Sequence, residues 1–154
     1  MSLPALDHAV IDVRDQLDEA AAQYRALRFY LTDRGYHTLG SANHRAIFRT
    51  NYLELLAAGL PGGKIRQELA SFPEGMSGVV LATHDADADY RAITARGVVM
   101  RAPDSFSRPV RLADGGRDAR FHTTHVQTGE VPFAQTEREY ICFDQAGLSR
   151  QLSH

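Results

Sequence analysis

A strand followed by an amphipathic helix occurs near the start of the sequence and again about seventy residues later. The first strand reads LDHAVIDV over residues 6–13, and the second reads GVVLAT over residues 78–83. The helices that follow also correspond, because residues 24–27 read YRAL and residues 90–93 read YRAI. An internal repeat constrains the fold strongly, since each copy must be one supersecondary unit and the two units must pack against each other.

Short strand-like segments follow the helix in both copies. In the first copy they are residues 29–32, 36–39, 46–48 and 52–56, and in the second they are 98–101, 110–112, 120–126, 140–143 and the residues around 150–152. Chance similarity between two amphipathic helices is the alternative explanation, and the recurrence of the same order of elements argues against it. A strand, a helix and then antiparallel strands, occurring twice, predict an α+β fold. Two such βαβββ modules, side by side or exchanged between chains, can close one cupped mixed sheet around a cavity.

The chain of 154 residues is long enough for one domain with a full hydrophobic core. We predict a single domain made of a first module over residues 4–58, a linker over residues 59–75 and a second module over residues 76–154. The linker begins with GLPGG and is expected to hold a short helix over residues 64–72. Asp15 is the predicted N-cap of the first helix.

Composition and charge exclude several classes of protein. The net charge is −2 with 23% charged residues, so the sequence offers no basic stripe for nucleic acid or for a membrane surface. No apolar run approaches the ~20 residues that span a bilayer, and the N-terminus does not read as a signal peptide. Cys142 is the only cysteine, which excludes a disulfide framework and a cysteine-rich zinc site. We therefore expect a cytoplasmic protein whose partner is a small molecule.

Four segments in a fixed order carry a resemblance to a known superfamily. They are LDHAVIDV at residues 6–13, Asn43-His44 before an apolar strand, YLELL at residues 52–56 and FHTT at residues 121–124. In this order they resemble the vicinal oxygen chelate superfamily, and within it the glyoxalase-like domain proteins. The resemblance covers the chain to about residue 130, and it implies paired βαβββ modules in one glyoxalase-like domain.

The resemblance also implies a divalent metal in the cup, because members of this superfamily take metal ligands from the first and last strands of each module. Carried over by position, the first module supplies His8 and Glu54, and the second supplies Gln151, where a glutamate is usual. The remaining position is Gly78, which has no side chain to bind a metal. One imidazole and one carboxylate suit Zn²⁺, Fe²⁺, Mn²⁺ or Ni²⁺. A histidine and a glutamate that face a polar cavity without metal are the alternative.

Other polar residues are candidates for substrate binding, namely His44, Arg45 and His122. Arg45 alternates with Ile47, so it can clamp a substrate carboxylate if it points into the cup, and it is otherwise a solvated charge at a sheet edge. His44, His122 and His125 are also alternative metal ligands, although His122 and His125 must lie on opposite faces of one strand. The sequence shows no nucleophile elbow, so no Ser–His–Asp set is predicted.

Two functions of different classes follow from the resemblance. The first is an enzyme, a metal-dependent lyase or isomerase or a dioxygenase, that binds two vicinal oxygens of a small substrate and uses Glu54 as ligand, base or both. The second is a metal-free protein that binds a small molecule, as bleomycin-resistance relatives do, and Gly78 and Gln151 favour it. A degenerate domain with a structural role is a third interpretation. Superfamily members often form C₂ dimers, so a homodimer is expected, and exchange of modules through the linker is one geometry open to it.

Overall fold

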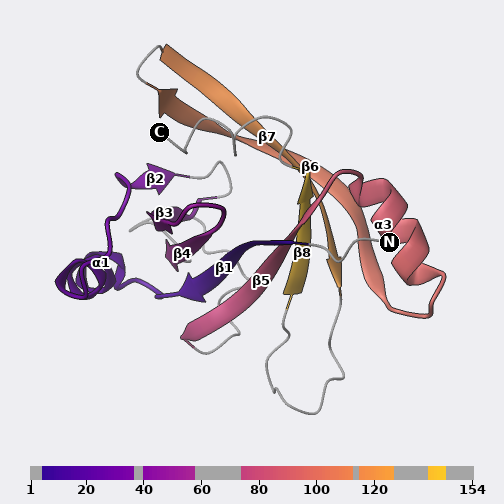
Figure 1. Cartoon of the computed structure of the whole chain (residues 1–154), viewed down its shortest axis with the longest axis horizontal. Helices are drawn as coiled ribbons and strands as arrows, with labels where there is room; N and C mark the ends of the chain where they lie inside the picture. The colour runs from indigo at the N-terminus through magenta and orange to yellow at the C-terminus, as the bar shows by residue number, and fades with distance from the viewer. Residues whose placement is uncertain (1–4, 37–39, 58–73, 113–114, 127–138, 145–154) are drawn as a thin grey trace.

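One curved mixed sheet of eight strands forms the centre of the protein within the residues that this computed structural model describes, which are 5–36, 40–57, 74–112, 115–126 and 139–144 (Figure 1). The strand order across the sheet is β2-β3-β4-β1-β5-β8-β7-β6. Along the chain the elements are β1 (Leu6–Asp12), α1 (Leu17–Ala26), β2 (Gly35–Tyr36), β3 (Ala42–Ile47), β4 (Tyr52–Ala57), β5 (Gly75–Thr83), α3 (Ala86–Thr94), β6 (Met100–Leu112), β7 (Gly115–Val126) and β8 (Glu139–Asp144).

The two halves of the sheet have the same topology. In the first half β1 is parallel to β4, and β4, β3 and β2 are successive antiparallel neighbours. In the second half β5 is parallel to β8, and β8, β7 and β6 are successive antiparallel neighbours. Because β1 and β5 lie side by side in antiparallel orientation, half a turn about an axis between them relates one topology to the other. This arrangement confirms the predicted α+β fold of paired βαβββ modules.

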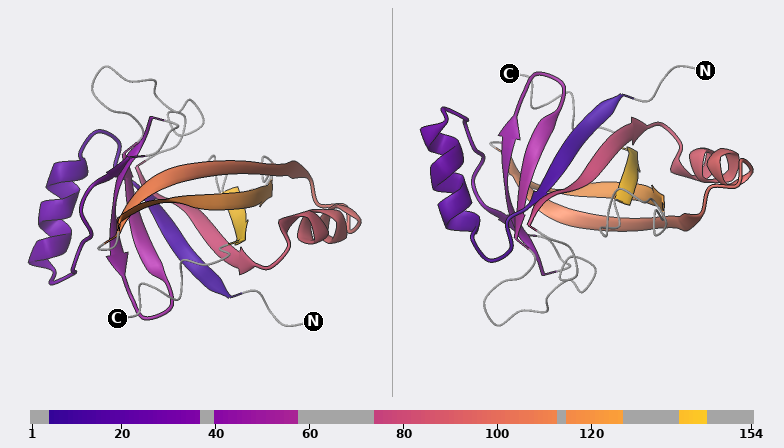
Figure 2. Two further views of the ribbon diagram at one scale, coloured as in Figure 1. Left: turned by 90° about the horizontal axis from the view of Figure 1, so that it is seen from above. Right: turned by 90° about the horizontal axis from the view of Figure 1, so that it is seen from below.

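The sheet curls until its two edge strands, β2 and β6, contact each other. In Figure 1 the hairpin of β6 and β7 reaches across the molecule toward β2. Figure 2 shows α1 and α3 at opposite ends, each outside the strands of its own module. The concave face of the sheet is therefore bounded by both modules, while the helices cover the outer face.

The hairpin of β6 and β7 is longer than the sequence indicates. Separate strands were expected at 98–101 and 110–112, but pairing runs from Met100 opposite Val126 to Leu112 opposite Gly115, with a register shift after Arg101. Prolines within this stretch disfavour a central strand because proline has no backbone N–H to donate. β6 is an edge strand, where proline is tolerated.

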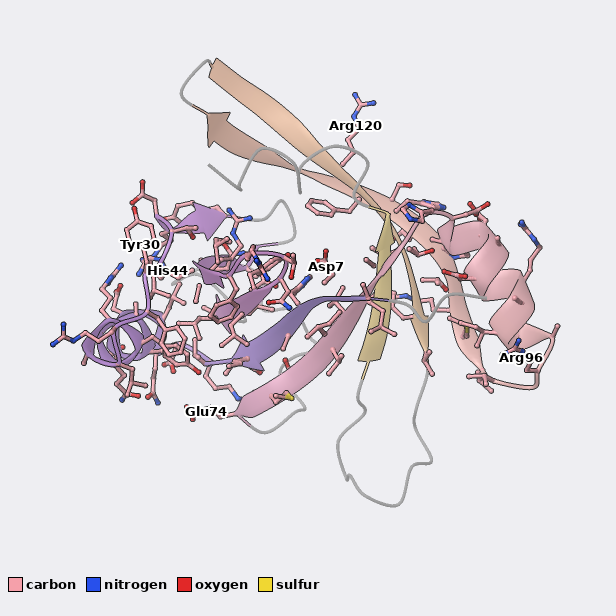
Figure 3. All side chains as sticks on the ribbon, in the orientation of Figure 1. Asp7, Tyr30, His44, Glu74, Arg96 and Arg120 are labelled. Carbon is pink, nitrogen blue, oxygen red and sulfur yellow. The ribbon has the colours of Figure 1, made fainter. Side chains whose placement is uncertain are left out.

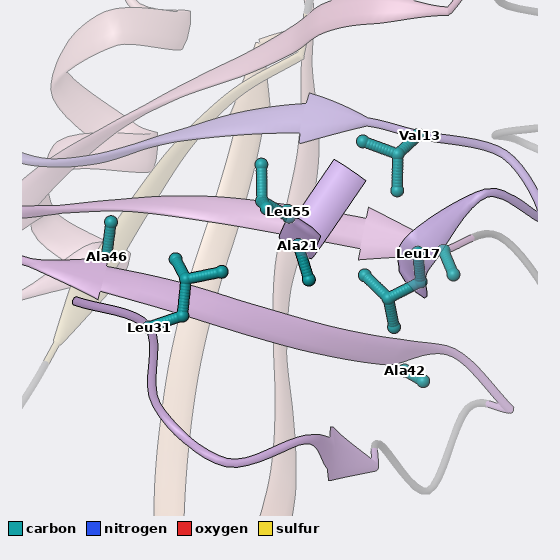
Figure 4. Packing of buried hydrophobic residues seen from close by; sticks show 8 residues of the cluster. Val13, Leu17, Ala21, Leu31, Ala42, Ala46 and Leu55 are labelled. Atoms are coloured by element: carbon teal, nitrogen blue, oxygen red, sulfur yellow. The ribbon is translucent and has the colours of Figure 1, made fainter. Parts of the chain in front are cut away.

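A hydrophobic cluster lies between α1 and the outer face of the first module (Figure 4). Leu17 and Ala21 are both buried and are one helical turn apart, so they form one side of the helix. Three alanines on β3 and β4 let the helix approach the sheet closely. The buried members of the cluster are Val13, Leu17, Ala21, Leu31, Ala42, Ala46, Leu55 and Ala57.

The two helices begin in different ways. Asp85 is the N-cap of α3, and its side chain accepts a hydrogen bond from the backbone N–H of Ala88 at 2.8 Å. The prediction that Asp15 caps the first helix is wrong, because the N-cap position of α1 is Gln16, which makes no side-chain capping bond.

Several predicted elements lie outside the described residues. These are the short helix over 64–72, most of the linker over 59–75 and the closing segment around 150–152. β5 begins at Gly75, so the last linker residue belongs to the sheet. β8 occupies the place beside β5 that β4 occupies beside β1. Within the described part of the chain, neither helix is long and apolar enough to cross a membrane.

Candidate functional site

The alternation of side chains along β1 separates the hydrophobic core from a polar concave face. Val13 belongs to the cluster beneath α1, whereas His8 and Val10 project from the opposite face. His8 pairs with Tyr52 on β4, and Val10 pairs with Glu54. Paired residues in neighbouring strands project from the same face, so His8, Tyr52 and Glu54 are brought together on the concave side.

Asp7, His8 and Glu54 form a buried polar cluster on this face. His8 Nδ1 lies 2.7 Å from Asp7 Oδ2, and His8 Nε2 lies 3.6 Å from Glu54 Oε2. The exposed fractions of Asp7, His8 and Glu54 are 9%, 2% and 8%. A carboxylate that accepts the Nδ1 proton fixes the ring and leaves the Nε2 lone pair directed toward Glu54. Two potential metal-ligand atoms therefore face each other in a protected position.

A β-bulge explains how Asp7 reaches the ring of its own neighbour. Adjacent residues on a regular strand point to opposite faces. The pairing of β1 with β5 shifts register between Leu6, which is opposite Leu81, and His8, which is opposite Val80. Because a bulge sets two residues against one and re-aims a side chain, Asp7 comes to the same side as His8. Figure 3 labels Asp7 near the centre of the molecule.

Residues from β3 and β4 hold the histidine and the glutamate in place. Asn43 Nδ2 donates a hydrogen bond to Glu54 Oε1. The rings of His8 and Tyr52 stack, with centroids 4.2 Å apart and planes inclined by 11°. The guanidinium of Arg45 lies 5.9 Å from the centroid of the Tyr52 ring. These contacts fix the carboxylate of Glu54 and the plane of the imidazole.

The substrate-binding residues predicted in the first module lie on opposite faces of the sheet. Arg45 is the cross-strand partner of Glu54, so it projects from the concave face. It is half-buried on an interior strand, and the alternative of a solvated charge at a sheet edge is wrong. His44 projects toward the α1 side, where its Nδ1 lies 2.8 Å from the Thr32 carbonyl oxygen (Figure 3). The structure brings Arg45 to the His8 site and separates His44 from it.

His122, predicted to bind substrate from the second module, also lies on the outer face. Its Nδ1 is 2.7 Å from Ser105 Oγ, and its Nε2 is 2.8 Å from Asp87 Oδ2 in the first turn of α3. The side chains of His122 and Asp87 are 34% and 54% exposed. This Ser–His–Asp set was not predicted; it joins β6, β7 and α3 at the surface, where ion pairs contribute about 1 kcal/mol or less. Gln151 lies outside the described residues.

Three residues of the site were missed as candidates, namely Asp7, Asn43 and Tyr52. Asn43 lies two residues before Arg45, and Tyr52 lies two residues before Glu54. Since residues two apart on a strand share a face, alternation was the signal that could have found both. Asp7 gave no such signal, because its side chain reaches His8 only through the bulge.

The second module has no counterpart of His8 and Glu54 at the matching positions of its described strands. Glu54 pairs with Val10, which is two residues beyond His8. Gly78 is aligned with His8, and Val80, two residues beyond it, pairs with Ile141. Glycine and isoleucine therefore stand where the first module has histidine and glutamate.

His8 and Glu54 fit a divalent metal. Nitrogen and carboxylate ligands lie about 2.0–2.2 Å from such an ion, so two ligand atoms that share one can lie no more than about 4.3 Å apart. The 3.6 Å between His8 Nε2 and Glu54 Oε2 is within this limit. The described residues hold no set of three or more histidine, cysteine, aspartate or glutamate side chains placed to bind a metal. Further ligands would have to come from water, from substrate or from elsewhere in the chain.

Asp12 is another buried carboxylate, at the end of β1. It is 0% exposed, and its Oδ1 accepts a hydrogen bond from the backbone N–H of Arg14 at 2.8 Å. Its Oδ2 makes no hydrogen bond to the residues that the structure describes and lies 3.9 Å from Arg14 Nε. Burial raises the pKa of Asp12, while the hydrogen bond and charge of Arg14 oppose this and the charge of Glu74 adds to it. The fold therefore favours the protonated form of Asp12.

A carboxyl group with a raised pKa contributes stability that is fully present below its ordinary pKa and is lost as the pH rises through its pKa in the folded protein. Asp12→Asn keeps the Oδ1 acceptor and does not ionise. We therefore expect the free energy of unfolding of this variant, minus that of the wild type, to be larger at pH 7 than at pH 4. Urea unfolding at both pH values measures the difference. Asp15→Asn, at an exposed carboxylate, is the control. An equal difference at both pH values would contradict the expectation.

Comparisons with known proteins agree with this architecture. The family model described as a glyoxalase-like domain matches residues 6–153. No match is found among curated proteins. A solved hypothetical protein from Staphylococcus aureus has a TM-score of 0.74 at 16% identity, over 98% of this chain and 62% of that one. The chain thus spans less than two thirds of that protein.

Two methylmalonyl-CoA epimerases are also similar in structure. A variant of the Streptomyces coelicolor enzyme, in complex with 2-nitronate-propionyl-CoA, has a TM-score of 0.63 at 23% identity, over 94% of this chain and 97% of that one. The Mycobacterium tuberculosis enzyme has a TM-score of 0.61 at 20% identity, over 95% and 91%. These likenesses concern the fold alone. The match of the family model over nearly the whole chain shows that the protein belongs to the glyoxalase-like domain family, within the vicinal oxygen chelate superfamily.

Proposed function

We propose that the protein is an enzyme that binds two adjacent oxygens of a small substrate on the concave face, with a divalent metal held by His8 and Glu54. The observation that carries this proposal is the 3.6 Å approach of His8 Nε2 to Glu54 Oε2 between two buried side chains. Burial removes the hydration of a carboxylate. A cation between the two atoms would compensate for that loss.

Each residue of the site has a distinct task in this proposal. A bound divalent ion supplies a Lewis acid that polarises a substrate carbonyl. Asp7 holds the His8 ring through Nδ1, and Tyr52 stacks on it, so Nε2 stays directed at the site. Glu54 acts as a ligand and takes a proton from the carbon beside the carbonyl, as a general base. Arg45, on the same face, binds a substrate carboxylate.

The names of two fold neighbours support an isomerase or lyase over a dioxygenase. Both are methylmalonyl-CoA epimerases, and one holds 2-nitronate-propionyl-CoA. The nitronate nitrogen and the thioester carbonyl carbon of that ligand are both bonded to C2, so the ligand offers two oxygens that one cation can bind together. The substrate proposed for this chain would also offer two oxygens to one ion, but on directly bonded carbons.

Metal binding is the direct test of this proposal. We expect the metal-stripped protein to bind about one Ni²⁺, Zn²⁺, Mn²⁺ or Fe²⁺ per chain in a calorimetric titration. The loaded protein should bind 2-oxohexanoate, whose carboxylate and ketone oxygens are vicinal, at least about tenfold more tightly than the stripped protein. The proposal would be contradicted if the protein takes up none of these ions and its affinity for the acid is the same before and after they are added.

A metal-free ligand-binding protein is the second candidate. Gly78 and Ile141 favour it, because the positions that match His8 and Glu54 in the second module carry no ligand atom. On this alternative an aromatic ligand would stabilise the stripped protein against heat by mass action, and metal would add nothing.

A further inference from the structure

A continuous row of paired residues connects the His8 site to the second module. His8 pairs with Val80 on β5, Val80 pairs with Ile141 on β8, and Ile141 pairs with His125 on β7. Because paired residues project from the same face of a sheet, His125 lies on the concave face together with His8. The opposite face of β7 carries His122, which contacts α3.

Thr123 and His125 are buried polar residues on this face of β7. Their exposed fractions are 1% and 6%, and Thr123 Oγ1 lies 3.4 Å from His125 Nε2. Each side chain carries a group that can donate a hydrogen bond, the hydroxyl of Thr123 and a ring N–H of His125. In the first module Arg45 pairs with Glu54. In the second module His125 pairs with Ile141, the residue that matches Glu54 in the repeat. His125 is therefore the counterpart of Arg45.

Arg101 adds a positive charge beside this pair. It is the cross-strand partner of His125 on β6, and it is exposed. Cross-strand partners in an antiparallel pair have Cβ atoms about 4.5–5.5 Å apart on one face. Guanidinium, imidazole and hydroxyl groups on one face of neighbouring strands match a carboxylate, which accepts about four hydrogen bonds.

We infer that Thr123, His125 and Arg101 form a carboxylate subsite, and that the substrate is a diacid that carries the vicinal oxygens at one end and a second carboxylate at the other. This inference rests on the proposed function, which puts the oxygen pair at His8 and Glu54. Three strand spacings separate β1 from β7 along the sheet, which limits the span to about 14 Å. The curl that brings β2 to β6 shortens the direct distance, so a compact diacid spans the concave face.

The test compares 2-oxoadipate with 2-oxohexanoate, which share chain length and vicinal oxygens and differ in the terminal carboxylate. We expect the metal-loaded wild type to bind 2-oxoadipate at least about tenfold more tightly in calorimetry. Arg101→Gln and His125→Asn should each reduce this preference to about threefold or less and leave the affinity for 2-oxohexanoate unchanged. Arg120→Gln removes a charge that projects outward from the same hairpin (Figure 3), and it should keep the preference.

Arg101 is exposed, so its variant keeps the test decisive if the buried His125 variant does not fold. His8→Ala separates the subsite from the proposed function, because it should weaken both acids equally and preserve their ratio. If the metal-stripped wild type still prefers 2-oxoadipate, the subsite is supported and the metal has no part in the preference. A wild type without the preference, or a preference that survives in both variants, would overturn the subsite, and a wild type that binds neither acid would overturn both proposals.

Discussion

Replacing Leu55 by alanine is expected to lower the free energy of unfolding by about 2–5 kcal/mol. Leu55 is 0% exposed on β4, an interior strand, and it belongs to the cluster beneath α1. The substitution removes buried methyl groups and leaves a cavity, which the neighbouring alanines of the cluster are too short to fill. Equilibrium unfolding in urea measures the change.

Leu27→Ala is the matched control for this substitution. Leu27 is 67% exposed at the C-cap of α1, so the same change there should alter the free energy of unfolding by about 0.5 kcal/mol or less. If Leu55→Ala were as mild as Leu27→Ala, the core would not lie between α1 and β4. The opposite face of β4, which carries Glu54, would then lose its assignment as the concave side.

The order of elements could be predicted from the sequence because strands and helices leave local patterns. The last strand of the first module was expected at 52–56 and is observed at Tyr52–Ala57. The length of β6 could not be predicted in this way. Its pairing depends on β7 as a partner and on its place at the edge of the sheet, and neither is a local property. The homodimer and the cytoplasmic location stay predictions.

The candidate site was predictable only as far as strand alternation reaches. His44 and Arg45 are adjacent, so one of them had to face away from Glu54, and a shift of one residue in register reverses the choice. The pairing of β3 with β4 decides it in favour of Arg45. Asp7 reaches His8 through a bulge between β1 and β5, two strands far apart in the chain, so no local pattern marks it.

Removing either His8 or Glu54 is expected to weaken metal binding by more than about 100-fold. Loss of a residue that only orients a ligand weakens binding by about 10–100-fold, and loss of the ligand itself should exceed this. His8→Ala and Glu54→Ala, titrated with Ni²⁺ or Zn²⁺ against the wild type, measure the effect. Retention of the metal in both variants would contradict the assignment of these two ligands.

Asp7→Asn and His44→Ala complete this series with an intermediate and a control. Asp7 orients His8 through its contact with Nδ1, so Asp7→Asn should weaken metal binding by about 10–100-fold. His44 is as buried as the site residues but lies on the outer face, and His44→Ala should leave the affinity unchanged. A loss in His44→Ala equal to that in His8→Ala would show that the fold, and not the site, had been disturbed. If His8 holds the metal, the loss of metal affinity should be largest in His8→Ala, intermediate in Asp7→Asn and absent in His44→Ala. A general loss of structure would not produce this order, because it does not depend on whether a residue is a ligand or orients one.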